Sequence, residues 1–195
     1  MSYNLFRAKA LRANHRQARV HRHDFTFQTT SDELGALIGF LAAIGSNALP
    51  ANLDPTETLN PDVVLEFNAR SLHGAERVRE HVQDVWAQYP VVILSEVGRG
   101  DLAELTRGVK RLFALYKLKP LPMMLDIDLR DDKRVLKPLL YRLTGLSSFP
   151  LILIGGHPIL DVNSVFSLDK AGALAELLRT SGAIVGGSDA RRKYE

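Results

Sequence analysis

The acidic side chains of this 195-residue chain are densest near residue 130. Four aspartates fall close together there: Asp126, Asp128, Asp131 and Asp132. Ca²⁺ and Mg²⁺ prefer carboxylate oxygens, but they need them to converge in a defined loop, and the spacing of an EF-hand loop is absent. Lys133 and Arg134 follow directly, so we predict a solvated turn that neutralises its own charge, and no metal site.

Two short patterns nearby also have a chemical interpretation. Gly98-x-Gly100 precedes an expected helix, where backbone N–H groups can hold an anion, although a full phosphate-binding fingerprint is absent. Arg99-Gly-Asp101 spells the integrin-binding tripeptide, which sequences match by chance, so Asp101 is predicted to cap a helix instead. Three histidines near the start of the chain lack a matching second pair of ligands, so we predict no zinc site from His15, His21 and His23.

The chain contains no cysteine, which excludes disulfides, thiolate metal sites, cysteine nucleophiles and thiol redox chemistry. Hydrophobic residues make up 46% and charged residues 24%, as is typical of a folded globular protein. The longest apolar stretch, residues 34–44, is too short to cross a bilayer, so we expect no transmembrane segment.

Positive charge is concentrated in residues 1–23, which contain no acid and form a basic N-terminal arm: Arg7, Lys9, Arg12, Arg16, Arg19 and Arg22. Without those six, the 25 basic residues fall to 19 against 22 acidic ones, so the rest of the chain carries a net charge of −3. Three interpretations stay open. The arm binds the phosphates of nucleic acid, or it is a mitochondrial-type transit segment, or it lies on an acidic protein surface. We expect an intracellular protein, mitochondrial if the arm is a transit segment and otherwise cytoplasmic.

The elements that must position any site begin after this arm. Residues 24–29 alternate polar and apolar side chains, which predicts a short edge strand. Thr30 and Glu33 have the spacing of a capping box ahead of a helix that continues to about Ile44, and Gly35 and Gly39 would let that helix pack closely against a neighbour. Residues 50–62 contain three prolines and no periodicity, so they are interpreted as a linker.

A regular alternation of helices and strands follows. Amphipathic helices are predicted at 75–88, 101–116, 131–143 and 169–180, and strands at 91–94, 123–127, 151–154 and 157–160. Gly155-Gly156 is a strong two-residue hairpin signal between the last two strands. This order predicts an α/β fold in which a small mixed sheet has helices on both faces.

Residues 74–182 resemble the glutaredoxin family, a branch of the thioredoxin fold. Pro90-Val-Val-Ile-Leu-Ser95 looks like the family's first strand. Leu143-Thr-Gly145, Phe149-Pro150 and Ile154-Gly-Gly-His-Pro-Ile159 follow its later spacing. The resemblance implies a thioredoxin-like, four-stranded mixed sheet with an N-terminal helical extension, and a cis peptide bond before Pro150.

The departures from the family concern its chemistry. A Cys-Pro-Tyr-Cys or Cys-Gly-Phe-Ser motif is replaced by Glu96-Val-Gly-Arg-Gly-Asp101, and the family's glutathione-binding lysine falls near Glu96. Leu160-Asp-Val-Asn-Ser164 replaces a glycine-glycine-x-aspartate-aspartate turn, and Phe149 is expected to plug the glutathione groove. The positions that correspond to the family's site are Glu96, Gly98, Arg99, Gly100, Asp101, Phe149, Pro150, Asp161, Val162, Asn163 and Ser164. We predict no catalytic residue and no cofactor.

These observations divide the chain into four parts: a basic arm (1–23), an extension with one helix and a Pro-rich linker (24–62), a glutaredoxin-like domain (63–183) and a basic tail (184–195). The favoured hypothesis is a non-catalytic binding or structural subunit, docked in a larger assembly through its N-terminal extension. One alternative is an RNA-binding component of an organellar ribosome-type particle that uses the basic arm. Another is a glutathione-binding transferase or oxidoreductase-like activity that needs no protein thiol.

Overall fold

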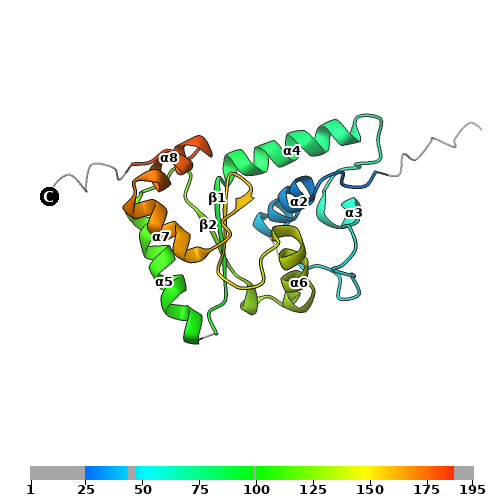
Figure 1. Ribbon diagram of the computed structural model, residues 1–195. Helices are drawn as coiled ribbons and strands as arrows, with labels where there is room; N and C mark the ends of the chain where they lie inside the picture. Colours follow the sequence, from blue (N-terminus) through cyan, green and yellow to red (C-terminus); the bar gives the residue numbers. More distant parts are fainter. Residues whose placement is uncertain (1–24, 44–46, 99, 187–195) are drawn as a thin grey trace, which may run out of the picture.

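A computed structural model describes residues 25–43, 47–98 and 100–186. Its elements, in chain order, are α2 (Thr30–Ala42), α3 (Pro61–Val64), α4 (Gly74–Gln88), β1 (Val91–Ser95), α5 (Gly100–Leu115), β2 (Met123–Asp126), the 3₁₀ helix η1 (Ile127–Leu129), α6 (Lys133–Thr144), β3 (Leu151–Ile154), β4 (His157–Pro158), α7 (Val162–Lys170) and α8 (Ala173–Thr180) (Figure 1). The basic arm and residues 187–195 of the basic tail lie outside the described residues.

The four strands form one mixed sheet in the order β2-β1-β3-β4. Strand β1 pairs in parallel with β2 and antiparallel with β3, and β3 pairs antiparallel with β4. A parallel pair joined through α5, followed by an antiparallel hairpin and helices, is the thioredoxin-like arrangement that the resemblance implies. The predicted fold class is therefore confirmed.

The sheet separates two apolar cores, because both of its faces are covered by helices (Figure 1). Val92 and Leu94 of β1 face the core that includes α2, α4 and α6. Val91 and Ile93 face the opposite core, with α5, α7 and α8. All five residues of β1 are buried, as a central strand with helices on both sides requires.

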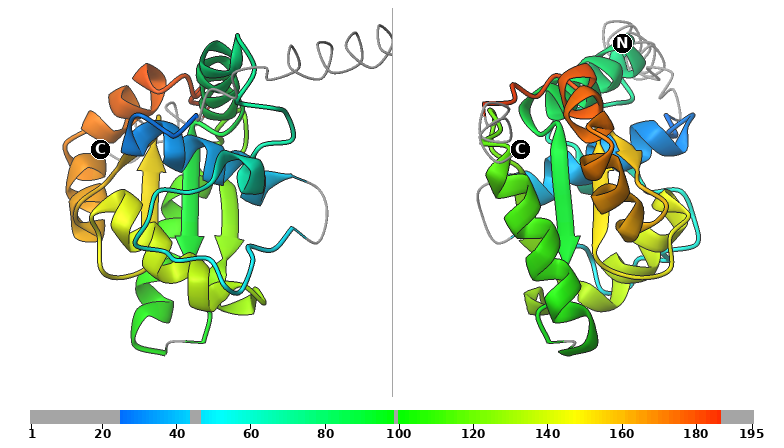
Figure 2. Two further views of the ribbon diagram at one scale, coloured as in Figure 1. Left: turned by 90° about the vertical axis from the view of Figure 1, so that its right-hand side faces the viewer. Right: turned by 60° about the vertical axis from the view of Figure 1, so that its left-hand side comes forward.

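The N-terminal extension is part of the first core. Leu34, Leu37 and Ile38 of α2 are buried there, and α2 with the segment after it crosses the same face of the sheet as α6 (Figure 2). The helices α2 and α4 approach closely at two glycines. A Cβ at Gly35 would lie 2.6 Å from a methyl group of Val82, and one at Gly39 would lie 2.9 Å from Nε2 of His81. The predicted close packing of these glycines is confirmed.

Two arginine–carboxylate pairs fasten the extension to the second half of the chain. Arg142 of α6 binds the buried Glu33 of α2, with 2.6 Å between Nη2 and Oε1, and also donates to the carbonyls of Pro55 and Glu57. Arg130 binds the buried Asp132 at 2.8 Å, and Asp132 also accepts a hydrogen bond from the backbone N–H of Leu49. The Pro-rich segment is thus held along its length by side chains from far along the sequence.

Some local predictions were wrong. Residues 25–29 contain no strand. Thr29 rather than Thr30 caps α2 by accepting from the N–H of Asp32, and Glu33 binds Arg142 instead of closing a capping box. Asp101 lies inside α5, which begins at Gly100, so it is not the N-cap.

The last two predicted elements also differ from the structure. Strand β4 covers only residues 157–158, although the N–H of Ile159 still donates to the carbonyl of Ile152. The helix expected at 169–180 begins only at Ala173, as α8, because Gly172 adopts a left-handed conformation (φ 75°), and the helix before it, α7, was not predicted. Such a conformation ends a helix, and glycine adopts it without steric cost.

Candidate ligand groove

A groove of about 470 Å³ lies between the first turns of α5, the loop from α6 to β3, and the segment that leads into α7. It brings together five of the predicted site residues: Phe149, Pro150, Asp161, Val162 and Asn163. The rest of its lining is formed by Leu102, Leu105, Gly145, Leu146, Ser147, Ser148, Ile159 and Leu160. Asp161 is the one charged residue in this lining, so the groove has a single carboxylate, at one end.

The loop from α6 to β3 is shaped at both of its ends. Gly145 ends α6 in a left-handed conformation (φ 69°), with its N–H bonded to the carbonyl of Tyr141. The peptide bond between Phe149 and Pro150 is cis, as the resemblance implies. The ring of Phe149 does not plug the groove: it is buried in the first core, with its centre 5.5 Å from that of Tyr141.

The other end of the groove is the N-terminus of α7. Asp161 caps this helix, because its Oδ1 accepts a hydrogen bond of 3.0 Å from the N–H of Asn163. The first residues of a helix carry backbone N–H groups that are ready to bind an anion. In this chain, a carboxylate of the chain itself already occupies that place. Ser164 lies within α7, where its hydroxyl donates to the carbonyl of Asp161 at 2.5 Å.

In the loop after β1, where the family has its redox motif, backbone N–H groups are likewise bound by a carboxylate of the chain. The carboxylate of Asp128 accepts hydrogen bonds from the backbone N–H groups of Val97 and Gly98, at 3.0 and 2.8 Å. Burial raises the pKa of Asp128. These two hydrogen bonds and nearby Lys137 lower it by more than burial raises it, so the net pKa lies below its ordinary value. The anion-cradle hypothesis for Gly98 therefore needs correction: the N–H groups of Val97 and Gly98 are already bound by Asp128.

The remaining predicted positions near this loop lie outside the groove. Gly100 begins α5. Arg99 and the side chain of Asp101 are outside the described part of the chain. Glu96, only 3% exposed, forms an ion pair with Lys137 of α6. This pair lies directly beyond the end of β1.

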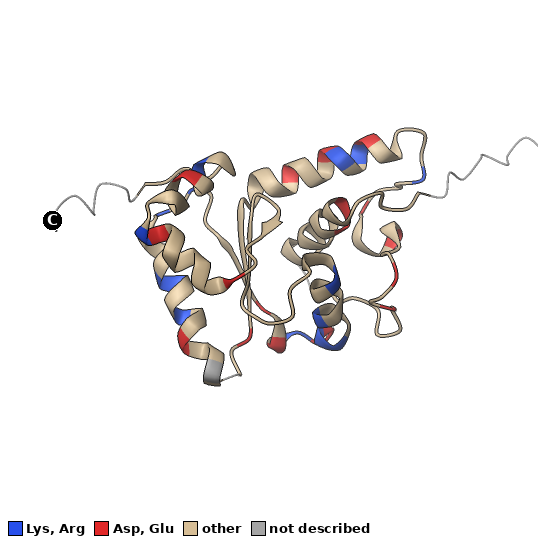
Figure 3. Cartoon of the chain, viewed as in Figure 1, with Lys and Arg blue, Asp and Glu red and all other residues tan. Residues whose placement is uncertain are grey.

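Three of the four clustered aspartates have separate partners. Asp126 accepts from the hydroxyl of Ser95 at 2.5 Å and from Lys110 at 3.0 Å. Asp128 binds the loop after β1, and Asp132 binds Arg130. Figure 3 shows acidic and basic residues interspersed along the chain at this end of the molecule. No group of three histidines or acidic residues in the described part of the chain is arranged to hold a metal ion.

No family model matches the chain. The chain is 27% identical to glutaredoxin-C1 of Arabidopsis thaliana over 121 residues, which are 62% of this chain and 92% of the relative. The chain is therefore similar to a glutaredoxin over most of that relative's length.

Two similar solved structures come from plants. Buckwheat glutaredoxin in complex with glutathione has a TM-score of 0.45 and 23% identity, over 59% of this chain and 99% of that chain. The holo form of glutaredoxin C1 from Populus tremula x tremuloides has a TM-score of 0.43 and 23% identity, over 53% of this chain and 87% of that chain. Unlike the motif of the family it resembles, the corresponding loop of this glutaredoxin-like chain holds no cysteine.

Sequence reasoning missed part of this site. Leu102 and Leu105 line the groove, although their helical spacing favours a place in the core. The role of Asp128 has no local signal, because its partners are about 30 residues away along the chain.

In the described part of the chain, no helix is both long and apolar enough to cross a membrane.

Proposed function

We propose that this glutaredoxin-like protein is a non-catalytic binding or structural subunit, docked in a larger assembly through its N-terminal extension. One observation carries the proposal. The backbone N–H groups of residues 97–98 and the N–H of Asn163 at the start of α7, which could hold an anionic ligand, are bound by the chain's own Asp128 and Asp161.

The residues of the groove do not fit glutathione. This tripeptide carries two carboxylates, which need positive charge or unoccupied N–H donors. The groove lining contains no lysine, arginine or histidine, and its one charged side chain is the carboxylate of Asp161. With no cysteine in the chain, neither a thiolate nucleophile nor a mixed disulfide with the protein can form. These features support a binding role rather than an oxidoreductase.

The extension supports the docking part of the proposal. It is fixed to the domain by apolar packing, by the pair Glu33–Arg142 and by the hydrogen bond from the N–H of Leu49 to Asp132. A partner held by the basic arm would therefore be joined through a short connection to a rigid domain. The cell compartment, mitochondrial or cytoplasmic, stays a prediction.

The chemistry is tested by two measurements on the purified full chain. We expect no reduction of a mixed disulfide of glutathione above the rate in buffer, and no heat of glutathione binding in titration calorimetry. Arabidopsis glutaredoxin-C1 serves as the positive control for the first assay. A clear rate above buffer, or saturable glutathione binding, would contradict the proposal and favour the glutathione-dependent alternative.

Docking is tested by comparing partners captured by the full chain and by a chain without residues 1–23. A second variant replaces the six basic residues of the arm with glutamine. We expect both variants to lose the partner while their thermal unfolding is unchanged. If capture is the same for all three chains, the arm does not dock the protein. If the material lost is RNA and its retention falls steeply with salt, the ribosome-type alternative is supported instead.

A further inference from the structure

Strand β2 forms one edge of the sheet. It pairs with β1 on one side, and in the described chain no other strand pairs with it. The segment around Ile184 bonds to Lys119 and then to the carbonyl of Tyr116, so it runs away from β2 rather than along it. The outer N–H and C=O groups of β2 are therefore available to an added strand.

The side chains of β2 are unevenly buried. Met124 is paired in register with Ile93, which places it on the α5 face of the sheet, and it remains 43% exposed. Met123 and Leu125 point to the opposite face, where they pack against the first core. The edge thus offers one apolar side chain beside α5.

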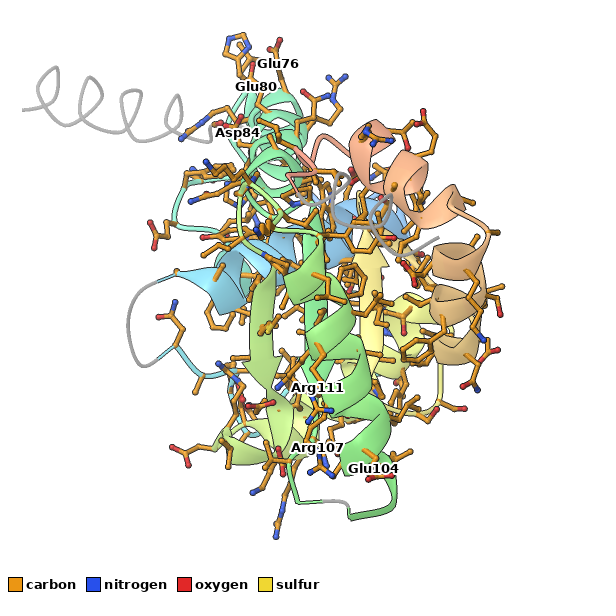
Figure 4. The ribbon with its side chains drawn as sticks, turned by 90° about the vertical axis from the view of Figure 1, so that its left-hand side faces the viewer. Glu76, Glu80, Asp84, Glu104, Arg107 and Arg111 are labelled. Carbon is orange, nitrogen blue, oxygen red and sulfur yellow. The ribbon has the colours of Figure 1, made fainter. Side chains whose placement is uncertain are left out.

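Basic side chains of α5 border this edge. Arg107 and Arg111 extend from α5 toward the side where β2 lies, whereas the acidic residues of α4 lie at the far end of the molecule (Figure 4). Both arginines are exposed, and Arg107 has only a 3.9 Å contact with the largely solvated Glu104. Lys110, between them, already neutralises Asp126 at the end of β2. The border of β2 is therefore net positive.

We propose that the β2 edge, with Met124, Arg107 and Arg111, binds an extended peptide that carries two acidic residues separated by one position. Four residues of helix advance about 6 Å and two residues of strand about 6.6 Å, so the two arginines match alternate side chains of an added strand. Backbone hydrogen bonds to β2 supply affinity, and the two carboxylates select the peptide. This surface lies apart from the groove, so the inference does not depend on the proposed function.

The test uses the full chain and a short fluorescent peptide with the central sequence Val-Glu-Val-Glu-Val. Fluorescence anisotropy measures its affinity for the parent chain and for the double variant Arg107→Gln/Arg111→Gln. We expect the double variant to bind about tenfold more weakly, which corresponds to the loss of two exposed charge pairs of about 0.7 kcal/mol each. The matched control, Arg79→Gln/Arg134→Gln, removes two exposed arginines elsewhere and should bind like the parent. The basic arm is the same in all of these chains.

Two further measurements locate the binding. The peptide should slow amide hydrogen exchange within Met123–Asp126, and a peptide with proline in place of the central valine should not bind, because it lacks the required N–H. Equal affinity for the parent and the Arg107/Arg111 variant, or exchange unchanged in β2, would overturn the proposal. So would a single-stranded RNA that binds through the same arginines while the peptide does not bind. Thermal unfolding of both variants should match the parent, since all four arginines are exposed.

Discussion

The pair formed by Glu33 and Arg142 allows a quantitative test of how the extension is held. Replacing Arg142 with leucine removes an ion pair of 2.6 Å and two hydrogen bonds to carbonyls of the Pro-rich segment. It leaves the carboxylate of Glu33, 4% exposed, with the N–H of Leu59 at 2.8 Å. Loss of one partner of a buried pair costs about 3–5 kcal/mol. Because the Arg142 side chain is itself 28% exposed, we expect a somewhat smaller loss, about 2–4 kcal/mol.

Urea unfolding followed by circular dichroism measures this loss, and the corresponding fall in Tm is about 5–15 °C for a chain of this size. The control is Arg79→Leu, which removes an exposed arginine from α4 and should change the unfolding free energy by about 0.5 kcal/mol or less. The double variant Glu33→Met/Arg142→Leu should be more stable than the sum of the two single losses, because it buries no unpaired charge. If Arg142→Leu is as mild as its control, the pair behaves as a solvated surface contact and this reasoning fails.

Two other substitutions test packing and acid stability. Alanine in place of Gly35 should destabilise the protein by about 1–3 kcal/mol through overpacking. The control is Gly108→Ala, whose added Cβ would have its nearest contact at 3.4 Å, and it should stabilise α5 by up to about 1 kcal/mol. Equal shifts in thermal unfolding for the two variants would contradict the close approach of α2 and α4. Burial raises the pKa of Asp132. Arg130 and the N–H of Leu49 lower it by more than burial raises it, so the pKa in the folded protein lies below 3.8. Its ionised form therefore stabilises the fold above about pH 3.8, and this contribution is lost as the pH falls through the lower folded pKa. Asp132→Asn should lower the free energy of unfolding by about 1.5–3 kcal/mol at neutral pH and make the acid unfolding transition shallower. A urea midpoint that is unaltered at both neutral and acid pH would disprove this role.

The sheet was predictable because its signals are local. A short, wholly apolar run such as Val91–Ser95 indicates a strand buried on both faces, and a helical period identifies the helices that cover it. The close packing at Gly35 and Gly39 was predictable for the same reason, since small side chains on one face of a helix favour a neighbour. The boundary assigned between extension and domain stays a prediction.

The missed features depend on residues distant in sequence. The Pro-rich segment has the composition of a linker, but Arg142, more than 80 residues further on, binds its carbonyls. The same holds for the candidate site. Pro150 and Asp161 follow from the family's spacing, whereas the closure of the loop after β1 by Asp128 requires the ends of β1 and β2 to lie together. The local sequence pattern contains no information on contacts between residues that are far apart along the chain.

The contact between Glu33 and Arg142 spans 109 residues, which has a consequence for biosynthesis. Ribosomes add about 5–20 residues each second, so α2 leaves the exit tunnel on the order of 5–20 seconds before α6 does. During that interval the complete sheet against which the apolar side of α2 packs has not yet formed. The nascent chain therefore exposes an apolar helix face early in translation, and its final docking against α6 waits until nearly three quarters of the polypeptide has been made.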